Sequence, residues 1–161
     1  MNRQEQQLMT ALIRAKRWAA LATQGPDGPE ASWVAYVPEA DCSGFLLHLS
    51  SLAAHTRHLL ADPHPRAGLA ISEAEQADTD PQTLARVMIH GRVAVLAKDS
   101  ADYQAAALRY QDRLPDSIPR FDFSDFQLLR LTPTRIRFVG GFARAYTLDA
   151  AALRAAAQDD R

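Results

Sequence analysis

The densest group of side chains that could do chemistry lies between Leu47 and Leu59. An apolar run gives way there to a helical pattern, and hydroxyl and cationic side chains gather at the junction: Ser50, Ser51, His55, Thr56 and Arg57. The first turn of a helix has unpaired N–H groups and a partial positive charge, so it favours anions. The segment therefore predicts a phosphate site. The alternative is that Ser51 caps the helix and the other side chains face solvent.

Two further segments contain arginines at positions where an anion could bind. Arg86 begins an otherwise apolar run, and a guanidinium group can bind phosphate oxygens through two parallel hydrogen bonds. An edge-strand arginine that points to water is the alternative. Gly140-Gly141-Phe142-Ala143-Arg144 lacks the spacing of a dinucleotide-binding fingerprint, so its glycines indicate either a sharp bend or a close approach to a planar ligand.

Metal and thiol chemistry are disfavoured. His55 and His58 share one face of the predicted helix and His64 follows, but neither cysteines nor a glutamate accompany them as a zinc site would require. We therefore expect no metal. Cys42 is the only cysteine, and it lies in a polar turn with no neighbouring base or cation to lower its pKa, which argues against a nucleophile.

Helical and extended patterns are interspersed along the chain. Helices are expected at 2–18, 52–61, 100–112 and 149–157, and strands at 20–23, 31–37, 45–49, 67–72, 85–97 and 127–139, the last as one bent strand or a pair around Pro133. The segment 114–126 is expected to be a loop. Short strands with helices inserted between them favour an α+β, mainly β, antiparallel barrel with peripheral helices.

Composition restricts the classes of partner. The 161 residues are 47% hydrophobic and suit one domain, 1–161. The 18 Lys+Arg nearly cancel the 19 Asp+Glu, so neither nucleic acid nor an anionic membrane is an expected partner. A polar N-terminus, the absence of an 18-residue apolar run and the single cysteine predict a cytoplasmic protein without signal peptide or anchor.

Three segments together resemble one known family. They are Ala31-Ser32-Trp33-Val34-Ala35-Tyr36, the stretch Leu47–Leu59 followed by Asp62-Pro63, and Arg137–Ala145. In their order and spacing the chain resembles the pyridoxamine 5′-phosphate oxidase-like FMN-binding split barrels, and among them the haem-utilisation (HugZ-like) branch. The resemblance covers about Leu12 to Leu148, and it implies an antiparallel Greek-key split β-barrel.

The resemblance also implies a homodimer with FMN at the interface. The phosphate would be held by Ser50, Ser51, His55, Thr56 and Arg57 together with Arg86. The flavin ring would lie along the strand that contains Ser32 and Val34, and Phe142 and Arg144 would lie near the cofactor. One face of the apolar strand 45–49 would line the barrel, and the other would meet the flavin or the partner.

The implied activity is an FMN-dependent oxidoreductase acting on a small or planar substrate, with electrons from a nicotinamide donor or a flavin reductase. Two alternatives stay open: a haem-binding or haem-degrading protein that uses the same cleft, and a non-catalytic FMN carrier. Haem-degrading relatives place a histidine near the C-terminus, but no histidine follows His90 here, so either haem is bound through another residue or this member does not degrade haem. Pyridoxamine phosphate is disfavoured as substrate, because the family's Arg-Leu-His signature is here Arg144-Ala145-Tyr146.

Overall fold

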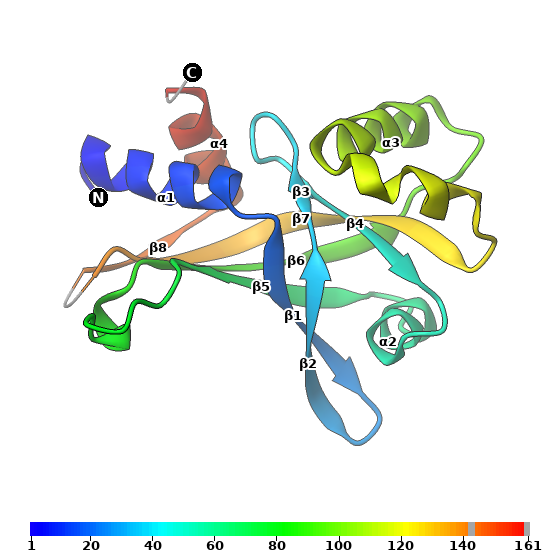
Figure 1. Ribbon diagram of the computed structural model, residues 1–161, viewed down its shortest axis with the longest axis horizontal. Coiled ribbons are helices and arrows are strands. Elements are labelled where there is room, and N and C mark those ends of the chain that lie inside the picture. Colours follow the sequence, from blue (N-terminus) through cyan, green and yellow to red (C-terminus); the bar gives the residue numbers. More distant parts are fainter. Residues whose placement is uncertain (142–143, 160–161) are drawn as a thin grey trace.

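The computed structural model describes residues 1–141 and 144–159 (Figure 1). Its centre is one antiparallel eight-stranded sheet of order β2-β1-β5-β6-β7-β4-β3, with β8 paired to β7. The strands are β1 Trp18–Gly25, β2 Gly28–Ala35, β3 Val37–Pro38, β4 Phe45–Ser50, β5 Arg66–Ser72, β6 Arg86–Val95, β7 Phe126–Val139 and β8 Ala145–Leu148. The predicted strands are confirmed, while β3 and β8 were not anticipated.

In the described part of the chain, four α-helices and two 3-10 helices surround the sheet: α1 Arg3–Ala15, α2 Ala54–Ala61, α3 Ala101–Arg113, α4 Ala150–Gln158, η1 Pro81–Thr83 and η2 Pro115–Asp122. Asn2, Ser100 and Asp149 begin α1, α3 and α4 by accepting a backbone hydrogen bond from the first turn. The expectation of a loop over 114–126 is wrong, because η2 occupies most of it. Among the described residues, no helix is both long and apolar enough to cross a membrane.

The long strand β7 ties the two halves of the sheet together. Its first half pairs with β4, its second half pairs with β8, and β6 runs along nearly all of it. The register with β6 shifts between His90 and Gly91, opposite Pro133. A proline cannot donate to the ladder, so it is tolerated at such an irregularity. The segment 127–139 is therefore one strand and not a pair.

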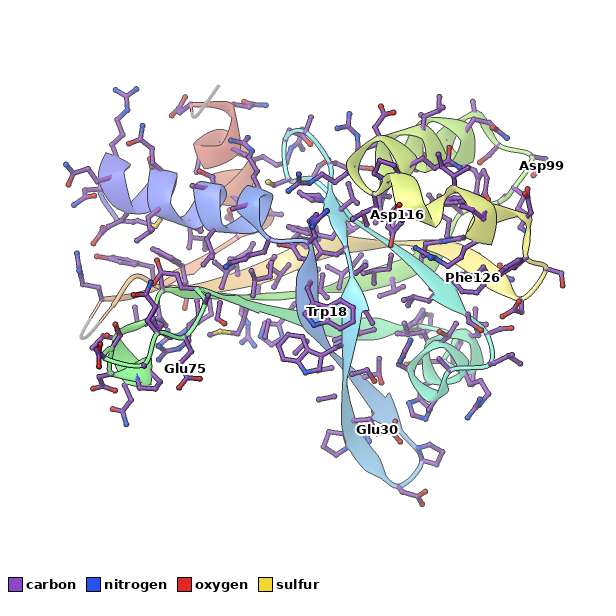
Figure 2. The ribbon with its side chains drawn as sticks, viewed as in Figure 1. Trp18, Glu30, Glu75, Asp99, Asp116 and Phe126 are labelled. Atoms are coloured by element: carbon purple, nitrogen blue, oxygen red, sulfur yellow. The ribbon has the colours of Figure 1, made fainter. Side chains whose placement is uncertain are left out.

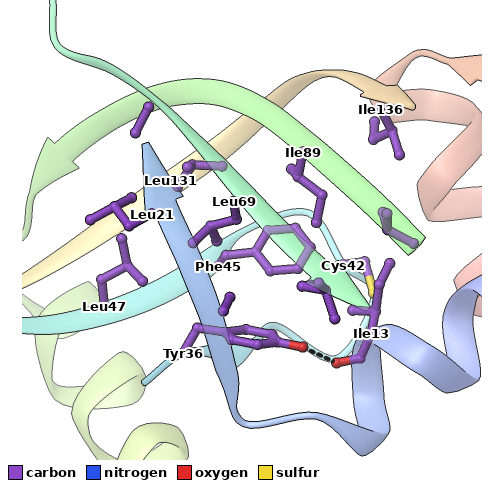
Figure 3. Packing of buried hydrophobic residues seen from close by; sticks show 14 of the residues in the cluster. Ile13, Leu21, Tyr36, Cys42, Phe45, Leu47, Leu69, Ile89, Leu131 and Ile136 are labelled. Atoms are coloured by element: carbon purple, nitrogen blue, oxygen red, sulfur yellow. Dashed lines mark hydrogen bonds between the residues drawn. The ribbon is translucent and has the colours of Figure 1, made fainter. Parts of the chain in front are cut away.

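The core lies inside the curl of the sheet (Figure 3). Phe45, Leu69 and Ile89 meet at its centre, and Met9 and Ile13 of α1 close one end. The buried Tyr36 hydroxyl donates to the carbonyl oxygen of Ile13 at 2.7 Å, which joins the helix to the barrel wall. This burial raises the pKa of Tyr36 far above its usual range.

Strand β4 is apolar on both faces, as predicted, but its outer face is covered from within the chain. Phe45 and Leu47 lie in the barrel core, whereas Leu46 packs in a second cluster beneath α3 with Tyr103 and Tyr110. The next outer side chain, His48, stacks on Phe121 with ring centroids 3.8 Å apart. The expectation that this face meets a flavin or a partner is therefore wrong.

Candidate functional site on an open sheet face

The outer face of β1, β5 and β6 has a floor of small residues. Side chains alternate between the two faces of a strand, and the middle outward positions of β1 and β5 are Ala20, Ala22, Gly68 and Ala70. Cross-strand pairing extends one row of this floor from Trp33 through Ala20 and Ala70 to Met88. Small side chains leave the backbone accessible, so a flat ligand or a second protein surface could approach closely.

Two tryptophans border this floor. Trp18 and Trp33 are 56% and 62% exposed, and their rings stack with centroids 6.0 Å apart and an angle of 7° between planes. Trp18 lies beside the β1 and β2 ribbons in Figure 2. Exposed aromatic surface bordered by polar groups is typical of interaction sites.

A cluster of three arginines lies where β6, β7 and β8 meet. A cavity of about 350 Å³ is lined by Arg86, Arg137 and Arg144 together with Gln82, Val139, Gly141 and Ala145. Arg86 Nη1 donates to the carbonyl oxygens of Gln82 and Leu84 at 3.2 and 3.1 Å, and Arg137 Nη1 donates to Thr147 Oγ1 at 3.1 Å. The structure thus brings the predicted residues Arg86 and Arg144 together. Arg137 was missed, because its place opposite Met88 depends on the pairing of β6 with β7.

A second, larger cavity lies at the other end of the same face. It has a volume of about 600 Å³ and spans β1, β5, β6 and β7. Its polar side chains include Arg66, His90 and Arg135, and the small residues Ala22, Gly68 and Gly91 also line it. Sequence reasoning did not select these residues because Arg66, His90 and Arg135 are far apart in the chain. Strand pairing brings them together: His90 lies opposite Gly68 on β5 and opposite Arg135 on β7.

The predicted phosphate segment is closed by its own hydrogen bonds. Ser50 Oγ donates to Asp125 Oδ2 at 2.5 Å and accepts from the N–H of Leu52 at 3.1 Å, while the N–H of Ser51 donates to the Asp125 carbonyl oxygen at 2.7 Å. The N-cap of α2 is Ala53, without a side-chain hydrogen bond, so Ser51 is not the cap. The Asp125 carboxylate would also repel a phosphate dianion placed at Ser50.

Within α2, one of the three predicted ligands is open to solvent. Thr56 is completely buried and its hydroxyl has no partner among the described residues, so it does not reach solvent in this structure and its predicted phosphate contact stays a prediction. His55 is half-buried; burial, and then the neighbouring His58, lower its pKa. Arg57 is exposed and donates to the carbonyl oxygen of Leu52.

Arg86 and the α2 segment do not form one site within a chain. Arg86 pairs with Ser72 near the Trp18 end of β1, whereas α2 lies at the other end, where His58 Nδ1 is 3.3 Å from Thr23 Oγ1. At about 3.3 Å per residue these ends are roughly 20 Å apart. The loop around η1 and helix α2 accordingly lie at opposite sides of Figure 1. Contact of both with one phosphate would therefore need residues from two chains, and the predicted shared site at a dimer interface stays a prediction.

The predicted flavin-contacting side chains on β2 face the barrel. Val34 is 4% exposed and belongs to the core, and Ser32, two residues before it, is half-buried on the same face. Trp33 lies on the outer face between them. Side-chain contact from Ser32 and Val34 to a ligand on the outer face is therefore excluded, although the β2 backbone is still available. Phe142 lies outside the described residues, so its predicted role is untested.

The described residues contain no group of three or more His, Cys, Asp and Glu side chains that could hold a metal ion. Cys42 is buried, and its φ of 57° places it in a left-handed turn between β3 and β4.

Comparison with known proteins identifies the family. A family model described as Pyridoxamine 5'-phosphate oxidase matches residues 6–140. The chain belongs to the pyridoxamine 5′-phosphate oxidase-like split-barrel family. The predicted fold class is thus confirmed, because the curled antiparallel sheet with peripheral helices is this family's split barrel.

Among individual members of the split-barrel family, several similar proteins are named for haem. The chain is 29% identical to a heme binding protein from Mycobacterium smegmatis, with a TM-score of 0.81 over 96% of this chain and 61% of that one. It is 36% identical over 119 residues to the chloroplastic heme oxygenase HOZ of Arabidopsis thaliana, which is 73% of this chain but 34% of that protein. HutZ, the heme storage protein from Vibrio cholerae, shares the fold at 21% identity, with a TM-score of 0.69 over 78% of this chain and 87% of that one. The chain thus spans about a third of HOZ.

Proposed function

We propose that this split-barrel protein binds haem on the outer face of β1, β5 and β6 and takes part in haem degradation. The observation that carries the proposal is the floor of small residues, with arginine-lined cavities at both ends and two exposed tryptophans at its edge. Haem is a planar apolar ring with two carboxylates and an iron that takes a side-chain ligand. Each of these features has a chemical counterpart on this face.

The residues present fit such a ligand. Ala20, Ala22, Gly68 and Ala70 allow a flat ring to approach the sheet, while guanidinium groups suit carboxylates because both are planar and can form paired hydrogen bonds. The cavity of about 600 Å³ falls within the range of about 300–1,000 Å³ that is usual for small-molecule sites. The relatives named for haem support the same ligand class.

The protein's part in the reaction would be binding, orientation and exclusion of water. Bound haem would supply the redox chemistry at its iron. The guanidinium groups on the floor would fix the carboxylate edge of the ring and so determine which edge faces the tryptophans. Electrons would come from a nicotinamide donor or a flavin reductase.

A homodimer is part of this proposal. Trp18 and Trp33 expose more than half of their surface beside the alanine floor, and a second copy placed over this face would bury them. The same contact would remove water from the ligand site, which strengthens the interaction of buried carboxylates with arginine.

A hemin titration of the purified, ligand-free protein tests the proposal. We expect a saturable Soret band at one hemin per chain, followed by verdohaem or biliverdin bands when a reductant and oxygen are added. Binding without later spectral change would limit the function to haem binding. Absence of a saturable Soret band in a well-folded protein would contradict the proposal.

FMN is the second candidate ligand, as an oxidoreductase cofactor or as carried cargo. The observation that favours it is the cavity of Arg86, Arg137 and Arg144, whose volume of about 350 Å³ and triple positive charge suit a phosphate group. A parallel titration with FMN, followed by flavin absorbance and fluorescence, separates the two candidates. Saturable binding at one FMN per chain would support the flavoprotein function; turnover with an electron donor would then distinguish a catalyst from a carrier.

A further inference from the structure

We infer that His90 is the protein ligand of the haem iron and that Arg66 and Arg135 hold the haem carboxylates. The inference rests on the proposed function and names the residues that would perform it. No histidine was selected for this role from the sequence, and the three residues come from three different strands. The cavity of about 600 Å³ contains all of them.

His90 is exposed on the open face, inside the cavity of about 600 Å³. It lies at an outward position of β6, opposite Gly68 on β5. A Cβ atom built on Gly68 would be 3.8 Å from His90 Nδ1, so the imidazole leans over the one floor residue that has no side chain. The ring is therefore covered by no neighbouring side chain from β5, and its second nitrogen is free to bind a metal.

The backbone that presents His90 is fixed. The bulge between His90 and Gly91 brings Gly91 so close to β7 that a Cβ there would lie 2.6 Å from Leu131 Cδ2 and 2.9 Å from the Thr132 carbonyl carbon. Thr134 Oγ1 donates to the His90 carbonyl oxygen at 3.2 Å, which holds the bulge from the other side. The extra residue of the bulge is Thr134 on β7, between Pro133 and Arg135, so His90 keeps its regular outward position on β6; bulges recur beside functional sites.

The other four histidines are also in the described part of the chain, and none lies on the open face. His48 is buried against Phe121, and His58 lies inside the barrel end beside Thr23. His55 is half-buried on α2, on the barrel-end side of the sheet. His64 is exposed, but it lines a neighbouring cavity that shares Arg66 with the first and does not include His90. Position therefore selects His90.

Arg66 and Arg135 supply the matching charge. Both are exposed on the outer face, on either side of His90, and among the described residues neither forms an ion pair. Arg135 is the direct cross-strand neighbour of His90, about 5 Å away at the usual strand spacing. Two uncompensated guanidinium groups beside one imidazole match a ligand with two carboxylates and one metal.

The experiment compares hemin with two altered porphyrins on His90→Ala, Arg66→Gln/Arg135→Gln and the matched control His64→Ala. Iron-free protoporphyrin IX keeps the carboxylates but cannot be ligated, and hemin dimethyl ester keeps the iron but loses the carboxylate charge. Ligation is read from the electron paramagnetic resonance and magnetic circular dichroism spectra, and affinity from fluorescence quenching. Far-UV circular dichroism checks that each variant is folded.

We expect His90→Ala to remove the spectral signature of histidine ligation and to lower the affinity for hemin at least tenfold. The affinity for protoporphyrin IX should stay unchanged. Added imidazole should restore the ligation signature. The double arginine variant should lower the affinity for both hemin and protoporphyrin IX by about tenfold or more. Its affinity for hemin dimethyl ester should stay unchanged. His64→Ala should show the same ligation spectrum and the same porphyrin affinities as the unmodified protein. An unchanged ligation signature in His90→Ala would overturn the inference while leaving haem binding intact. Failure of the unmodified protein to bind hemin would instead overturn the proposed function, and this inference with it.

Discussion

Trp18 and Trp33 stack with nearly parallel rings across the β1–β2 hairpin, while each residue stays more than half exposed. Trp18 pairs with Ala35, and Trp33 pairs with Ala20, so the residue directly opposite each tryptophan is small. Such a pair gains part of its stability from stacking within the hairpin, yet it leaves a large apolar surface in water. A partner that covers the face would gain the remaining hydrophobic energy.

Substitution of Trp33 should therefore weaken self-association. We expect Trp33→Ser to raise the dimer dissociation constant at least tenfold, because central aromatic residues dominate the binding energy of protein interfaces. Sedimentation velocity over a range of protein concentrations measures the effect. Leu108→Ser, which removes an equally exposed apolar side chain from α3, is the control and should leave the dissociation constant unchanged. Equal effects of the two substitutions would place the interface elsewhere.

Arg86→Ala tests the second candidate ligand. The substitution should weaken FMN binding by about 2 kcal/mol, roughly 30-fold in the dissociation constant, because it removes a charge-assisted hydrogen bond to the phosphate. Arg135→Ala, at the other end of the face, should leave FMN affinity unchanged. Isothermal titration calorimetry gives both values. An Arg86→Ala protein that binds FMN as tightly as the unmodified chain would show that the phosphate lies away from the arginine cavity.

Much of the fold follows from local sequence pattern. The apolar alternation from Ala67 to Ser72 and the all-apolar run from Phe45 to Leu49 predicted β5 and β4, since burial on one or both faces leaves a direct signature. The four residues of β8 carry too short a pattern to detect. The cover of β4 was also beyond local reasoning, because Phe121 and Tyr110 reach His48 from distant segments.

The site was predicted only in part, for a related reason. Arg86 and Arg144 were selected as charged residues in apolar or glycine-rich surroundings, and they do share a cavity. Ser50 and Thr56 were selected from position along the chain, but sequence does not reveal that Asp125 binds one and that packing buries the other. His90, Arg66 and Arg135 meet through sheet register, which a single sequence does not specify.

Two glycines on the open face should respond differently to substitution. Gly68→Ala meets only ordinary van der Waals contacts, the nearest at 3.8 Å, so the free energy of unfolding should stay within about 0.5 kcal/mol of the original. Gly91→Ala would place its Cβ against the backbone of Thr132 and should destabilise by about 2–4 kcal/mol. Urea unfolding measures both.

Gly68→Phe extends this test to function. Because the position opens outward, the variant should fold, yet its ring would fill the floor beneath a bound ligand. We expect hemin affinity to fall at least tenfold, with little change in the urea midpoint. Retained affinity in Gly68→Phe would argue that hemin binds on another face.

His48 should make the protein less stable in mild acid. Burial, and then the nearby charge of Arg120, lower its pKa from about 6.5 to about 4. The native state therefore keeps His48 neutral between these values while the unfolded chain takes up a proton, so stability falls as the pH falls from about 6.5 towards 4 and loses nothing more from this group below that. Between pH 7 and pH 4.5 the shift corresponds to a loss of roughly 2–3 kcal/mol. His48→Phe, which keeps a ring against Phe121, should reduce the difference in unfolding free energy between pH 7 and pH 4.5 by about that amount.

Urea unfolding at the two pH values, with the exposed His64→Phe as control, measures the difference. An NMR titration that gave His48 an ordinary pKa would contradict the prediction, and would mean that the ring is open to water.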